Sequence, residues 1–105
     1  LVNDFALAPL PVLTGKAVYP PDVLQILEKS ARTRILAARA AAETLGNSRV
    51  QNIYLLGALI RSLMLDSEGF PWERMLEELV KPQYVDINKK AFIQGMQAIP
   101  AAEAV

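Results

Sequence analysis

AETLGNSRVQNIYLLGAL, residues 42–59, decides the fold, because it predicts the end of one helix, a turn and a second, almost wholly apolar helix. Gly46 suits the left-handed conformation in which many helices end, and Asn47 or Ser48 can cap the helix that follows. A helix with apolar residues on most of its sides must be buried, so we place it at the centre of the fold. Gly57 in its middle costs about 1 kcal/mol relative to alanine, which indicates close approach by a neighbouring backbone.

Apolar periodicity predicts further helices around this segment. Helices are expected at about residues 21–31, 37–45, 48–65, 71–81 and 87–96, the last of them capped by Asp86. Ile35-Leu36 is compatible with a short strand. Phe5–Leu13 carries two prolines, which cannot donate to a sheet ladder, so it predicts an edge strand or an extended segment. The tail from Pro100 is expected to be loose. Together these elements predict a single domain, or a piece of one, over residues 1–105.

Composition narrows the classes of function. The chain has 105 residues, of which 52% are hydrophobic, and this is enough for one hydrophobic core. Eleven basic and eleven acidic residues cancel, so no overall field favours nucleic acid or an acidic membrane. Cysteine and histidine are both absent. Their absence removes thiol nucleophiles, disulfides, Cys/His zinc sites, cysteine-bound iron–sulfur clusters and the usual general base.

No targeting or membrane-spanning segment is predicted. The start, Leu1–Asp4, lacks a basic region followed by a long apolar one. The longest apolar run, Ile53–Ile60, is far below the ~20 residues that a spanning helix needs. We therefore expect a cytoplasmic protein, which the absence of cysteine fits. Because the first residue is leucine and not methionine, we expect a processed product or a fragment of a longer chain.

No motif predicts catalysis or metal binding. Glu77 and Glu78 are adjacent on a helix and point apart, which favours a solvated face over a shared catalytic site. The sequence contains no Gly-rich phosphate loop, no nucleophile elbow and no metal-binding box. We therefore predict no catalytic residue and no metal site on this chain.

Two polar clusters are candidates for binding. The first lies at the start of the apolar helix and consists of Asn47, Arg49, Gln51 and Asn52. These residues can cap the helix and form structural hydrogen bonds, or offer the helix N-terminus to an anion or to a partner's backbone. The second is a basic stretch without acids, Lys29, Arg32, Arg34 and Arg39. It fits either a solvated surface or a phosphate site of a nucleotide or coenzyme.

Three segments resemble one family of enzymes. PLPVLTGKAVYP, residues 9–20, is similar to part of the beta subunit of indolepyruvate:ferredoxin oxidoreductases. Residues 42–59 resemble the signature region of the wider 2-oxoacid:ferredoxin oxidoreductase gamma-domain family, and VDINKKAFIQG, residues 85–95, resembles that family's closing helix. The order and spacing of the three segments agree across nearly the whole chain.

The resemblance implies an α/β, helix-rich, Rossmann-like domain. Only the C-terminal part of such a gamma domain is matched, because the Gly-rich strand–turn–helix with which the family domain begins does not occur in these residues. It also implies a complex that oxidatively decarboxylates 2-oxoacids to acyl-CoA and reduces ferredoxin. In such complexes thiamine diphosphate, iron–sulfur clusters and coenzyme A are handled by other subunits or domains. This chain is accordingly expected to bind no cofactor by itself.

The same resemblance implies that this chain docks against an alpha-type subunit and interacts with ferredoxin only through the complex. It also implies that the chain helps the complex to use coenzyme A. Asn47, Arg49 and Asn52 are then candidates for subunit docking and not for catalysis.

Two other hypotheses remain open from the residues alone. One is a helical self-association or scaffold domain without enzymatic role, which would use Ile53–Met64 and the face around Trp72. It is motivated by an excess of apolar residues for a chain of this size. The other is an autonomous module that binds coenzyme A or a nucleotide through Lys29 to Arg39.

Overall fold

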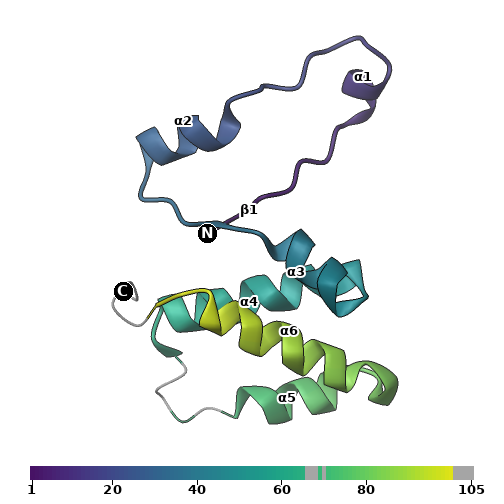
Figure 1. The fold of residues 1–105 in the computed structure, drawn as a ribbon, viewed down its shortest axis with the longest axis vertical. Coiled ribbons are helices and arrows are strands. Elements are labelled where there is room, and N and C mark those ends of the chain that lie inside the picture. Colours follow the sequence, from purple (N-terminus) through teal and green to yellow (C-terminus); the bar gives the residue numbers. More distant parts are fainter. Residues whose placement is uncertain (66–68, 70, 101–105) are drawn as a thin grey trace.

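The computed structural model describes residues 1–65, 69 and 71–100 (Figure 1). Its elements are, in order, β1 (Val2–Asn3), α1 (Leu10–Leu13), α2 (Val23–Ser30), β2 (Ile35–Leu36), α3 (Ala38–Leu45), the 3-10 turn η1 (Ser48–Val50), α4 (Gln51–Ser62), α5 (Trp72–Leu79), the 3-10 turn η3 (Pro82–Tyr84) and α6 (Val85–Gln97). The strands β1 and β2 pair in parallel, with Val2 opposite Ile35 and Asn3 opposite Leu36. The described chain is therefore helix-rich and α/β, as the sequence predicts, and the short strand at Ile35-Leu36 is confirmed.

The helices α4 and α6 form the centre of the helical body (Figure 1). Residues near the start of one helix meet residues near the start of the other, and the same holds for their ends. Val50, just before α4, packs in one cluster with Ala91, and Ala58, further along α4, packs with Ile99. The two helices therefore run parallel. Between them in sequence, α5 returns along the body and places Leu76 in the same core as Ile60 and Phe92.

The aromatic rings and one ion pair hold α5 against α6. The Trp72 and Phe92 ring centroids lie 6.4 Å apart in a tilted arrangement, which suits the quadrupoles of two aromatic rings. Lys89 of α6 donates a hydrogen bond to Glu77 of α5. This bond to Glu77 raises the pKa of Lys89 above its ordinary value.

Two glycines allow α4 and α6 to touch backbone to backbone. A Cβ atom added at Gly57 would overlap the carbonyl oxygen of Phe92 and lie 3.1 Å from the amide nitrogen of Met96. A Cβ atom added at Gly95 would overlap the carbonyl oxygen of Tyr54. The close approach predicted at Gly57 is confirmed, and Gly95 is its counterpart on the facing helix.

An arm leaves the sheet after β1 and returns to it at β2, carrying α1 and α2 (purple to blue in Figure 1). Neither of these two helices has a buried residue. The arm exposes four large apolar side chains by 70% or more of their surface, namely Leu7 (79%), Leu10 (70%), Leu13 (72%) and Val18 (89%). The arm therefore adds little to the core.

Several boundaries differ from the sequence prediction. The helices expected at 21–31 and 71–81 span Val23–Ser30 and Trp72–Leu79, and Ser48–Val50 form a 3-10 turn before α4. Leu10–Leu13 is a helical turn and not extended, because its prolines sit at the cap and in the first turn, where a missing N–H costs nothing. The long apolar helix ends at Ser62 and not at Leu65. The last helix begins at Val85, so Asp86 lies in its first turn and does not cap it. The prediction for the tail beyond Pro100 falls outside the described residues.

We predict that Gly57→Ala destabilises the protein. Helix propensity alone would give a gain of about 1 kcal/mol. The added methyl meets backbone atoms of α6, which no side-chain rotation can clear, so overpacking of up to about 3 kcal/mol outweighs that gain. The expected result is a net loss of about 2 kcal/mol in the free energy of unfolding, measured by urea denaturation followed by circular dichroism.

The matched control is Gln94→Ala, at an exposed position of α6 next to Gly95. It should change the free energy of unfolding by no more than about 0.5 kcal/mol. A Gly57→Ala protein as stable as the wild type would show that the two helices do not depend on this contact.

Candidate functional site

The turn between α3 and α4 is built by two residues that the sequence singles out. Gly46 ends α3 with a φ of 94°, in the left-handed region, and the amide of Asn47 donates to the carbonyl of Ala42 at 3.1 Å. The side chain of Asn47 then accepts a hydrogen bond from the backbone amide of Arg49 at 2.9 Å. The predicted helix end is thus confirmed. Asn47 and not Ser48 is the cap, and it caps the 3-10 turn η1 that leads into α4.

This turn forms one wall of a groove with a volume of about 630 Å³. The opposite wall comes from the end of α5, from η3 and from the start of α6. The groove is lined by Asn47, Arg49, Val50, Val80, Lys81, Tyr84 and Asn88. We call it the Arg49–Lys81 groove.

The structure brings two of the three docking candidates together. Asn47 and Arg49 line the Arg49–Lys81 groove, whereas Asn52 is exposed on the first turn of α4 and does not line it. Gln51, the fourth member of the polar cluster, has a structural role, since its side-chain oxygen accepts a hydrogen bond from Asn3 at 2.9 Å. That bond ties β1 to the start of α4.

Three residues of the groove were not predicted from the sequence. Lys81 precedes Pro82 and Tyr84 lies two residues after it, and this proline indicates only that a helix ends. Asn88 is 8% exposed, and its side-chain nitrogen donates to the carbonyl of Tyr84 at 2.8 Å. A polar residue one position after an inward-facing Ile87 was the available signal, because a buried amide needs partners.

The groove is positively charged. None of the described residues that line it is acidic. Within the part of the chain that the structure describes, neither the Arg49 guanidinium nor the Lys81 ammonium forms an ion pair. The groove can therefore attract carboxylate or phosphate groups.

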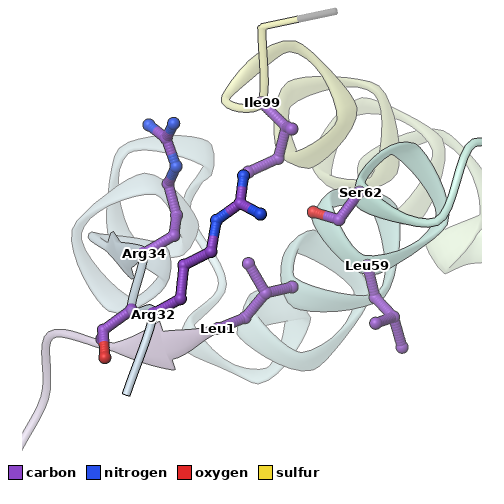
Figure 2. A pocket seen from close by; sticks show the side chains of 7 residues that line it. Leu1, Arg32, Arg34, Leu59, Ser62 and Ile99 are labelled. Atoms are coloured by element: carbon purple, nitrogen blue, oxygen red, sulfur yellow. The ribbon is translucent and has the colours of Figure 1, made fainter. Parts of the chain in front are cut away.

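The basic stretch of the sequence is divided by the fold. Arg32 and Arg34 line a second cavity, of about 430 Å³, with the apolar side chains of Leu1, Leu59 and Ile99 and with Thr33 and Ser62. Figure 2 shows the side chain of Arg32 reaching across this cavity toward Ile99 and Ser62. The Thr33 hydroxyl already donates to backbone carbonyls of the arm, and that of Ser62 to the carbonyl of Ala58.

The other two basic residues of the stretch do not line that cavity. Arg39 lies at the start of α3, where it pairs with Glu43 at 2.8 Å and stacks 4.6 Å from the centre of the Phe5 ring. It therefore fastens the base of the arm to α3. Lys29 is exposed in the last turn of α2. The four basic side chains consequently do not form one phosphate site.

The described residues contain neither a metal-binding cluster nor a membrane-spanning helix. Among those described, no three His, Cys, Asp or Glu side chains gather as a metal site would require. Over the same residues, none of the helices has the length and apolar character needed to cross a bilayer.

Comparison with known proteins identifies the family. The pyruvate ferredoxin/flavodoxin oxidoreductase family matches residues 3–98. This chain belongs to that family. It is 32% identical to the indolepyruvate oxidoreductase subunit IorB of Pyrococcus horikoshii and 30% identical to that of Thermococcus kodakarensis. Each alignment covers 91% of this chain and 50% of the relative, so the chain spans about half the length of the curated relatives it matches. No solved structure matches.

Two variants should separate the structural from the functional residues of the turn. Asn47→Ala removes a helix cap and should lower the free energy of unfolding by about 1 kcal/mol. Arg49→Gln removes a charge whose side chain has no partner among the described residues, so it should change stability by no more than about 0.5 kcal/mol. Urea denaturation of both proteins measures the difference. Equal losses would mean that Arg49 is a structural residue.

Proposed function

We propose that this chain is the C-terminal part of a Rossmann-like gamma domain in an indolepyruvate, or another 2-oxoacid, ferredoxin oxidoreductase. The family match and the two indolepyruvate oxidoreductase relatives support this reading. The parallel pairing of β1 with β2 supports it as well, because parallel strands are typical of α/β folds. The complex would oxidatively decarboxylate a 2-oxoacid to an acyl-CoA in the cytoplasm.

Within that complex the chain would have a docking and structural role and no active site of its own. The observation that carries this role is the Arg49–Lys81 groove, which presents part of the family's signature segment at the surface. Asn47, Arg49 and the exposed Asn52 would contact an alpha-type subunit. Thiamine diphosphate, iron–sulfur clusters and coenzyme A would be held by other subunits or domains, and ferredoxin would be reached through them.

Co-expression with an alpha-type subunit tests the docking role. We expect the two chains to co-purify, and ferredoxin reduction with a 2-oxoacid and coenzyme A to depend on both. Arg49→Ala should weaken the complex at least about tenfold, within the range of an interface hot spot. Arg32→Ala, another exposed arginine but outside the groove, is the control and should leave the affinity unchanged. Failure of the wild-type chains to co-purify would contradict the proposal.

Self-association is a second candidate, and the apolar arm favours it. Its exposed Leu7, Leu10, Leu13 and Val18 offer the kind of surface that proteins bury against partners. Leu59 on α4 and Leu63 directly after it are also 43% and 48% exposed, whereas Trp72 packs against Phe92. Light scattering should detect a dimer if this surface pairs with a second copy. A monomer at high concentration would remove this candidate and leave the first untouched.

A further inference from the structure

We propose that the Arg49–Lys81 groove binds an acidic, extended segment of a protein partner. The inference rests on the proposed docking function and adds the chemistry of what docks. Carboxylates of the segment would pair with Arg49 and Lys81, and its backbone would hydrogen-bond to Asn88.

The first support is the isolation of the two cations. Four other basic side chains of the helical body, Arg39, Arg74, Lys89 and Lys90, each have an acidic partner within the chain. Arg49 and Lys81 have none within the described residues, although the whole chain has as many acids as bases. The groove thus faces solvent with two uncompensated positive charges on opposite walls, and complementary charge on a partner would speed and orient docking.

The second support is the unfilled acceptor of Asn88. This side chain is 8% exposed, and its nitrogen is used by the carbonyl of Tyr84. Its oxygen has no hydrogen-bond donor among the residues described. That oxygen is not among the buried atoms left without a partner, so it is open to the groove and can accept from an N–H donor. A peptide backbone has such a donor, whereas inorganic phosphate or an isolated carboxylate at neutral pH offers mainly acceptors. The acceptor therefore favours a peptide over a small anion.

The third support is the apolar floor between the charges. Val50 is 3% exposed and lies at the bottom of the groove, while Val80 and the 43% exposed Tyr84 form its side. A volume of about 630 Å³ is within the range of ligand pockets and admits a few residues of an extended chain. The segment that fits has an apolar residue between acidic ones.

Titration with synthetic peptides tests the chemistry directly. The probes are an eight-residue peptide of alternating glutamate and valine, the same peptide with glutamine in place of glutamate, and inorganic phosphate, each followed by amide chemical shifts of this chain. We expect the acidic peptide to change the amide chemical shifts of Arg49, Lys81 and Asn88. Its binding should weaken when salt is added. The glutamine peptide should bind at least about tenfold less tightly, as the loss of charged partners implies.

The double variant Arg49→Gln/Lys81→Gln should reduce binding of the acidic peptide at least about tenfold, since both charged partners are lost. Lys16→Gln/Lys29→Gln, which removes two exposed charges from the arm, is the matched control and should leave binding unchanged. Equal binding of the two peptides, or no binding of the acidic one, would overturn the proposal. Phosphate competing as well as the peptide would assign the groove to small anions and would also overturn it.

The complex with the alpha-type subunit separates this inference from the proposed function. If the wild-type chains co-purify but the double glutamine variant binds as tightly and with the same salt dependence, docking occurs elsewhere and only the inference fails. If the wild-type chains do not co-purify, the proposed function fails, and the peptide titration alone decides what the groove binds.

Discussion

The backbone contact between α4 and α6 is the constraint on which the rest of the structure depends. Gly57 and Gly95 remove the side chains that would keep the helices apart, and each faces a carbonyl of the other helix. At this distance the neighbouring apolar side chains interlock, so that Phe92 is 1% exposed and Ala58 and Ala91 are fully buried. Dispersion and hydrophobic burial both grow with such close packing, and this offsets the conformational freedom that glycine loses in a helix.

The parallel direction of α4 and α6 decides where the candidate binding residues gather. Since both helices begin at the same end of the body, the turn that carries Asn47 and Arg49 meets the segment that carries Lys81 and Tyr84. A chain whose acids and bases cancel overall therefore acquires a locally positive groove. Its distribution of charge, and not its net charge, distinguishes this surface, as is usual where electrostatics orient a partner.

The arm and the helical body differ in how much of their apolar surface is buried. The body holds most of the buried residues, while α1 and α2 hold none and the arm presents large apolar side chains to solvent. Arg39 and Asn3 fix its base through an ion pair, a ring contact and two hydrogen bonds. A member of an oxidoreductase family that spans half of its relatives' length thus presents two kinds of exposed surface, one charged and one apolar.

The sequence by itself determined the local features of this protein. Gly46 and Asn47 act within one turn of their own positions, through a backbone angle and a cap, so their roles follow from residue type. Gly57 indicated a close approach, but its neighbour, α6, is known only from the structure. The helical turn at Leu10–Leu13 was missed because prolines suit a first helical turn as well as an extended edge. Only the tertiary structure decided which distant residues meet. Lys81, Tyr84 and Asn88 reach Asn47 and Arg49 through the packing of α4 on α6, and such contacts depend on the relative direction of helices, which no local pattern encodes.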